Sequence, residues 1–145
     1  KPAGELAKLI KPKLEDMGIE IIDEDVLKNA IKLYQDREKN LNDFTADILF
    51  FFKTPTPPEE LKNKYLDVES INFVKDFTDK IATLDWTDSN VNNFIKEFVK
   101  KKEVKFPAIA MPLRTIIAGT DNTPNIGSII FILGIDNIKE RISLF

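Results

Sequence analysis

The residues best equipped for binding lie in the last third of the chain. Arg114 precedes Gly119, and a short polar stretch leads from this glycine to Thr123-Pro124. A guanidinium offers only hydrogen-bond donors, and the start of a helix exposes backbone N–H groups, so both suit the acceptor atoms of a ligand. We therefore predict a helix that ends at Gly119, a polar turn, and a second helix with Thr123 as its N-cap and Pro124 as its first residue.

The chain lacks the side chains that most catalytic and metal sites need. It contains no His and no Cys, which excludes disulfides, thiol nucleophiles, His-based triads and the usual zinc sites. Its five glycines are scattered and form no phosphate-binding loop. Paired carboxylates or a lysine remain, but with 24 Asp and Glu no particular spacing nominates an acid–base pair. We therefore expect no catalytic residue, no metal site and no cofactor among these residues.

The charge balance bears on possible nucleic-acid binding. The formal net charge is −3, whereas proteins that bind phosphates usually carry a basic surface. One stretch is dense in lysines: Lys96, Lys100, Lys101, Lys102 and Lys105. We interpret it first as the end of a helix, where lysines complement the macrodipole, and only second as a phosphate contact.

The apolar stretches are too short to cross a bilayer. The longest, at residues 48–52 and 129–133, fall far below the roughly 18–20 residues that a membrane-spanning helix needs. The N-terminus carries no basic and apolar leader, and the first residue is not Met. We expect no membrane contact, a cytoplasmic location, and a fragment of a longer protein.

Apolar residues recur at steps of three and four almost throughout, which predicts an all-α fold. Asp23 and Asn40 are expected N-caps, and Pro12 is expected to kink or break the first helix. The best strand candidates, residues 19–22 and 104–106, are short. The prediction is a helical bundle or cage.

Three prolines in residues 54–58 form the clearest linker. They divide the chain into two predicted helical subdomains, residues 1–54 and 55–145, packed together. Pro58 is expected as the first residue of a helix. Trp86, before a capping stretch at 87–89, is assigned a structural role, and the eleven Phe are assigned to the core.

Four segments together resemble a known family. Residues 33–39, Asp85-Trp86-Thr87, Pro112-Leu113-Arg114 and residues 119–124 resemble, in order and spacing, the C-terminal anticodon-binding region of bacterial-type glutamyl-tRNA synthetases, which are class I enzymes. The resemblance spans about the whole chain. It implies a helical cage of two subdomains, attached to a Rossmann-type catalytic domain of the same polypeptide.

The resemblance also implies a function. The helices would bind the anticodon of tRNA-Glu, with tRNA-Gln as a second candidate, and the parent enzyme would be a monomer that attaches glutamate to tRNA with ATP and magnesium. The His-containing and Lys-Ser-Lys-type signatures of that catalytic domain are not in this chain. The chain would therefore recognise RNA and leave the bond-forming step to the catalytic domain.

The resemblance assigns anticodon contacts to Arg37, Arg114, Thr123, Pro124 and Ile126. Arg37 falls where the family distinguishes the third anticodon letter. Cytosine presents the acceptors O2 and N3 to a guanidinium, whereas the pairing edge of guanine presents mostly donors.

The sequence departs from the family at two places. Gly127 replaces a larger, often aromatic residue, which removes a base-stacking contact, and Ile135-Asp136 replaces a Lys-Glu pair. Arg141 is retained and is assigned a structural role.

Other interpretations of the same residues remain open. Arg37 could be a solvated side chain, and Arg114 could pair with Asp88 or Asp121. The chain as a whole could be a helical protein-interaction module without RNA binding. A stand-alone carboxylate enzyme is the weakest alternative.

Overall fold

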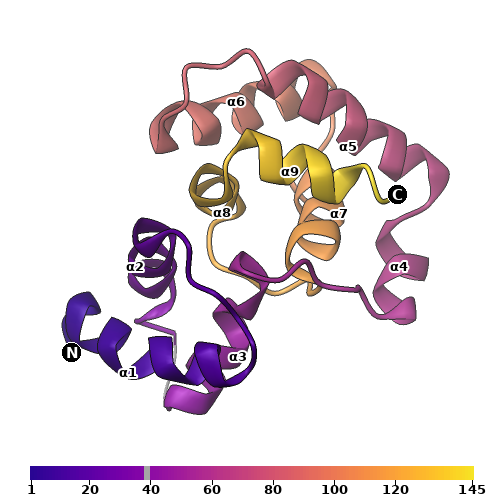
Figure 1. The fold of residues 1–145 in the computed structure, drawn as a ribbon. Helices are drawn as coiled ribbons and strands as arrows, with labels where there is room; N and C mark the ends of the chain where they lie inside the picture. Colours follow the sequence, from indigo (N-terminus) through magenta and orange to yellow (C-terminus); the bar gives the residue numbers. More distant parts are fainter. Residues whose placement is uncertain (38–39) are drawn as a thin grey trace. The chain divides into compact units, whose positions relative to one another are not determined.

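The computed structural model describes residues 1–37 and 40–145, and every regular element in them is a helix (Figure 1). The all-α prediction is confirmed. Neither of the two short strand candidates is a strand: residues 19–22 and 104–105 are irregular connections between helices. A few alternating residues do not distinguish a strand from an extended connection. No helix in these ranges is long and apolar enough to cross a membrane.

The described residues divide into two compact units, an N-terminal unit of Lys1–Thr54 and a C-terminal unit of Pro55–Phe145. That each unit is an anticodon-binding subdomain stays a prediction. The N-terminal unit contains α1 (Ala3–Asp16), α2 (Glu24–Tyr34), α3 (Leu41–Ile48) and the 3₁₀ turn η1 (Leu49–Phe51). The C-terminal unit contains α4 (Glu59–Tyr65), α5 (Val68–Ile81), α6 (Asp88–Lys101), α7 (Pro107–Ala118), α8 (Ile126–Leu133) and α9 (Ile135–Ile142).

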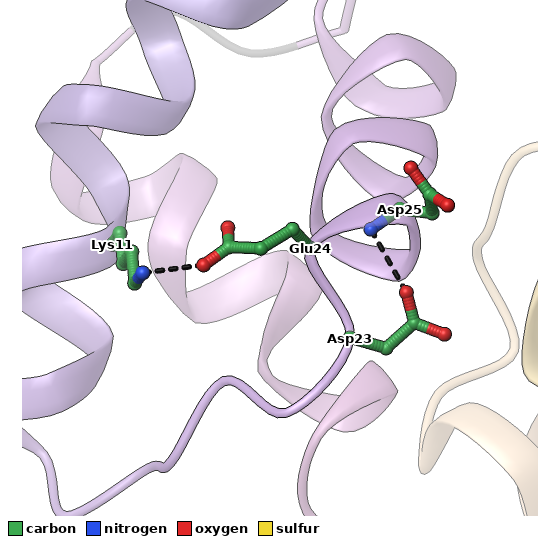
Figure 2. A network of polar contacts seen from close by, with 4 residues as sticks. All are labelled: Lys11, Asp23, Glu24 and Asp25. Atoms are coloured by element: carbon green, nitrogen blue, oxygen red, sulfur yellow. Dashed lines mark hydrogen bonds and ion pairs between the residues drawn. The ribbon is translucent and has the colours of Figure 1, made fainter.

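Side-chain caps mark the starts of α2 and α3 in the N-terminal unit. The Asp23 carboxylate accepts a hydrogen bond from the Asp25 amide at 2.9 Å, and Lys11 of α1 pairs with the neighbouring Glu24 of α2 (Figure 2). Asn40 caps α3 in the same way as Asp23 caps α2, so both predicted N-caps are confirmed. Pro12 does not break α1, because it lies on the exposed side of the helix, where water can bind the carbonyl group that its missing N–H leaves unpaired.

The helices α1, α2 and α3 pack on one another around a small core. Tyr34 contacts the rings of Phe50 and Phe51 edge-on, at centroid distances of 6.3 and 6.1 Å. The most deeply buried apolar side chains in this unit, at most 1% exposed, are Ile10, Leu14, Leu27, Ala30, Ile31 and Ile48.

Among the helices of the C-terminal unit, α7 has the most buried residues. It contacts α4, α5, α8 and α9, and α9 also packs along α8 and α5 (Figure 1). A cluster of four rings, from Phe73, Phe77, Phe94 and Phe98, joins α5 to α6. The core assignment is confirmed for Phe77 and Phe98, which are buried, whereas Phe73 and Phe94 are half-buried at the edge of the cluster.

The starts of α4 and α5 in the C-terminal unit differ from the sequence prediction, whereas that of α6 agrees with it. Thr87 caps α6 as expected, but Pro58 is the N-cap of α4 and not its first residue. The sequence did not indicate that Asp67 starts a separate helix, α5. The indole N–H of Trp86 donates to the carbonyl of Phe131 in the last turn of α8 at 3.1 Å, which ties the start of α6 to the end of α8.

Candidate nucleic-acid interface

The Arg114 guanidinium lies beside the turn between α7 and α8. Its Nε donates to the Thr123 hydroxyl at 3.0 Å, and Nη1 lies 3.8 Å from the sulfur of Met111. The side chain is half-buried, and its Cζ lies 6.0 Å from the centroid of the Phe106 ring. Within residues 1–37 and 40–145, Nη2 has no hydrogen-bond partner and no carboxylate lies within ion-pair distance of Arg114.

The alternative in which Asp88 or Asp121 neutralises Arg114 is therefore wrong for the described part of the chain. Arg114 is therefore a cation whose Nε is fixed by Thr123 and whose Nη2 keeps its donors for a ligand.

Thr123 does not cap α8, which corrects the sequence prediction. The helix begins at Ile126, and Asn125 is the N-cap, because its side chain accepts from the Ser128 amide at 3.0 Å. The Thr123 hydroxyl instead accepts from Arg114 and donates to the Pro124 carbonyl at 2.8 Å. Since this hydroxyl is buried and bonded on both sides, its contribution is to orient Arg114 and Pro124.

The turn at residues 119–125 is also held in place by Pro55 and Tyr65. Gly119 ends α7 in the left-handed region, at φ 71°, and a Cβ there would come 2.8 Å from Cβ of Pro55. Glycine is thus required both by the backbone angle and by the close approach of the proline. The Tyr65 hydroxyl donates to the Asp121 carboxylate at 3.3 Å. These contacts order the turn before any ligand arrives.

Pro124 and Ile126 have different environments. Pro124 is half-buried at the surface of the turn, whereas Ile126 is only 1% exposed. A direct contact between Ile126 and a base would require its side chain to leave the core. We therefore interpret Ile126 as the anchor that holds the start of α8 beneath Pro124.

Arg37 lies in the N-terminal unit, in the turn that follows α2. Its side chain is exposed, and its amide donates to the Tyr34 carbonyl at 2.9 Å. Glu38 and Lys39, the last two residues of the segment 33–39, lie outside the described residues. The structure thus brings Arg114, Thr123 and Pro124 together in the C-terminal unit. Arg37 belongs to the N-terminal unit.

The lysine-rich stretch has one member with a clear structural partner. Lys102 and Lys80 both pair with Asp76, each at 3.1 Å, and their hydrogen bonds, that of Lys80 first, lower the pKa of the Asp76 carboxyl. Lys100 and Lys101 lie in the last turn of α6, as the helix-end interpretation predicts.

Arg141 of α9 is bonded within the protein interior and is not presented to a ligand. It is buried and donates to the Ile117 carbonyl at 2.7 Å and to the Asn137 side chain at 2.6 Å. Burial lowers its pKa to about 10, which leaves it charged at neutral pH. Its positive charge lies against the C-terminal end of α7, where the helix dipole is negative. These contacts agree with the structural role expected for Arg141.

Phe106 is a candidate site residue that the sequence did not reveal. It was grouped with the core phenylalanines, yet 43% of its surface is exposed and its ring lies beside Arg114. The available signal was its position: it directly precedes Pro107, at a helix start, and eight residues before Arg114, which corresponds to about two helical turns.

Comparison with known proteins gives consistent matches over nearly the whole chain. The sequence model of the anticodon binding domain family matches residues 5–145. The glutamate–tRNA ligase of Methylobacillus flagellatus is 33% identical over 138 residues, which cover 95% of this chain and 30% of that protein. The glutamate–tRNA ligase of Dechloromonas aromatica is 31% identical over 144 residues, which cover 99% of this chain and 31% of that protein. The chain thus spans about three tenths of the length of these relatives.

Two solved structures have the same fold. A glutamate tRNA ligase from Elizabethkingia meningosepticum, in complex with its amino acid, superposes with a TM-score of 0.88 and 21% identity, covering 99% of this chain and 29% of that one. The glutamate-tRNA synthetase of Elizabethkingia anophelis gives a TM-score of 0.84 and 20% identity, covering 99% of this chain and 28% of that one.

Proposed function

The chain belongs to the anticodon binding domain family, and on this premise we propose that it recognises the anticodon of tRNA-Glu as part of a glutamate–tRNA ligase. The observation that carries the proposal is the half-buried Arg114, which Thr123 fixes through Nε while the Nη2 donors have no partner among the described residues. The names of the relatives support tRNA-Glu as the RNA and glutamate as the amino acid.

The chemistry of the turn suits unpaired bases. Sequence-specific RNA recognition works on splayed-out bases, through their pairing edges and through packing against apolar or planar groups. Arg114 would donate to base or phosphate acceptors, and Pro124 would supply an apolar contact next to it. A preordered turn reduces the conformational entropy that binding would otherwise cost.

Arg37 would read the third anticodon letter. Its donors suit the O2 and N3 acceptors of cytosine and suit the pairing edge of guanine less well. This favours tRNA-Glu over tRNA-Gln, which is the second candidate partner.

The rest of the polypeptide would complete the enzyme. A catalytic domain of the same polypeptide would attach glutamate with ATP and magnesium, in a monomeric cytoplasmic protein. The described residues gather no group of three or more His, Cys, Asp or Glu side chains that could hold a metal ion, and no catalytic step is assigned to them. The net charge of −3 is compatible with this division, because the catalytic domain would supply further phosphate contacts.

Binding of tRNA-Glu transcripts to the chain tests the proposal. We expect the wild-type chain to bind tRNA-Glu more tightly than a transcript with guanine as the third anticodon letter. Arg37→Ala should reduce that preference and leave the fold intact, as circular dichroism would verify. Equal affinity for transcripts altered at all three anticodon letters would contradict the proposal, and it would favour the protein-interaction module that the sequence left open.

A further inference from the structure

Phe106 differs from the other phenylalanines of the chain. All eleven lie in the described residues, and Phe106 is the one that is exposed, whereas five are buried and the rest are half-buried. A single exposed apolar side chain is ordinary on a protein surface. Its neighbour is what distinguishes it, because the ring lies beside the guanidinium of Arg114, with Cζ 6.0 Å from the ring centroid.

The same guanidinium connects the ring to the turn. Arg114 contacts the ring of Phe106 and donates through Nε to Thr123, which in turn donates to the Pro124 carbonyl. The ring, the cation and the turn therefore form one continuous strip, which runs from the start of α7 to the residues before α8. We call Phe106, Arg114, Thr123 and Pro124 the binding strip.

We propose that Phe106 is a stacking surface for an unpaired RNA base, and that it extends the anticodon site to the start of α7. The proposal rests on the proposed function. Every base has a flat π-face, so an exposed aromatic ring is a general platform for single-stranded RNA. A base on Phe106 would present its edge to Arg114, whose Nη donors would bind an acceptor such as O2 or N3 of a pyrimidine.

The charge next to the ring fits a nucleotide better than an apolar partner. Lys105 directly precedes Phe106 and is exposed, so its ammonium group can approach the phosphate of the stacked nucleotide. An apolar protein partner on Phe106 would instead have to bury the guanidinium of Arg114, which has no carboxylate partner in the described part of the chain.

The test compares Phe106→Ala, Phe106→Trp and the wild-type chain for binding to tRNA-Glu. Loss of one base–aromatic stack is expected to weaken binding about 5- to 150-fold in Phe106→Ala. Phe106→Trp keeps a ring and should bind within about threefold of the wild type, well inside the range for a lost stack. Val68→Ala, at an exposed apolar residue on α5, is the matched control and should leave the affinity unchanged.

Fluorescence gives a second readout that a purely structural role would not change. The wild-type chain contains a single Trp, Trp86, whose indole N–H is bonded to the Phe131 carbonyl. Phe106→Trp adds an indole at the proposed stacking surface. Addition of tRNA-Glu should quench the emission of Phe106→Trp much more than that of the wild type.

The outcomes separate the two proposals. If the wild-type chain shows no anticodon-dependent binding, the proposed function fails and the stacking role fails with it. If the wild type binds as expected, but Phe106→Ala binds within twofold of it or Phe106→Trp is not quenched, only the stacking role is overturned.

Discussion

The side-chain oxygen of Asn92 occupies the space that a side chain on Gly127 would need. A Cβ on Gly127 would lie 2.2 Å from Oδ1 of Asn92 and 2.7 Å from its Cγ. Asn92 lies on α6, and its amide is held by the backbone carbonyl of Asp88 at 3.0 Å. Position 127, where the resembled family often carries an aromatic residue, is therefore buried against α6 in this protein. The residue that position 127 can accommodate therefore depends on Asn92.

The coupling predicts that the cost of Gly127→Ala depends on the residue at position 92. Gly127→Ala should destabilise the chain by about 1–2 kcal/mol, because displacing Asn92 breaks its hydrogen bond and overpacks the contact between α6 and α8. In the Asn92→Ala background the two closest atoms are gone and the Asn125 Oδ1, at 3.1 Å, is the nearest that remains, so Gly127→Ala should cost at least about 1 kcal/mol less than in the wild type. Urea unfolding of the four proteins gives the coupling energy. Additive effects of the two substitutions would show that the contact does not constrain position 127.

Glu103 is a non-glycine residue in the left-handed region, at φ 56°. It ends α6 in a Schellman motif, in which its amide bonds the Lys100 carbonyl and the Val104 amide bonds the Val99 carbonyl. Glu103→Gly should stabilise the chain by about 0.5–1 kcal/mol, because it removes the strain of a Cβ in this conformation. Thermal unfolding measures the change. Glu97→Gly, in the exposed interior of the same helix, is the control and should cost about 0.8–1 kcal/mol.

The ion pairs of Asp76 predict a dependence of stability on pH. Its pKa is lowered in the folded state by Lys80 and Lys102. The stabilisation is therefore complete above the unfolded pKa, about 3.9, and is lost as the pH falls through the lower folded pKa. Because the side chains are more than a third exposed, Asp76→Asn should cost only about 0.5–1 kcal/mol at neutral pH.

Urea unfolding of wild type and Asp76→Asn at several pH values checks this. The difference between the two proteins should shrink below about pH 4, as the carboxyl becomes protonated in both the folded and the unfolded chain. It should also shrink in 1 M salt, which screens exposed pairs. Asp79→Asn, on the same helix, serves as the control. A difference that persists at pH 2 would mean that Asp76 stabilises the fold through something other than its charge.

The sequence predicted those parts of the fold that depend on neighbouring residues. The N-caps Asp23, Asn40 and Thr87 each bond an amide two or three residues ahead, so their signal is local. The start of α8 was misplaced because Thr123-Pro124 is itself a good start signal. A tertiary hydrogen bond from Arg114 takes the Thr123 hydroxyl, and Asn125 caps the helix instead.

The candidate site was predictable in its residue types but not in its contacts. Arg114 and the turn could be found from their order and spacing. The bond between Tyr65 and Asp121 joins residues 56 positions apart, and no local pattern indicates it. The exposure of Phe106 depends on where the chain between α6 and α7 turns, which composition and periodicity do not determine.

The bond between Thr123 and Arg114 predicts that a buried hydroxyl affects RNA binding without touching RNA. Thr123→Val keeps the shape of the side chain and removes the acceptor for Nε and the donor to Pro124, so we expect a loss of about 1–2 kcal/mol in stability. Arg114 would then lose its fixed orientation, and affinity for tRNA-Glu should fall about 10- to 150-fold, the range for a lost hydrogen bond to a charged group.

Thr123→Ser is the matched control, because it retains the hydroxyl and should bind tRNA-Glu within about twofold of wild type. Combining Thr123→Val with Arg114→Ala tests whether Thr123 affects RNA binding through Arg114. If Thr123 acts through Arg114, Thr123→Val should weaken binding little further in the Arg114→Ala background, whereas an independent contribution would add in full. Affinities measured at a temperature well below the unfolding transition of the least stable variant keep the loss of stability out of the comparison. Full additivity under those conditions would show that Thr123 does not act by orienting Arg114.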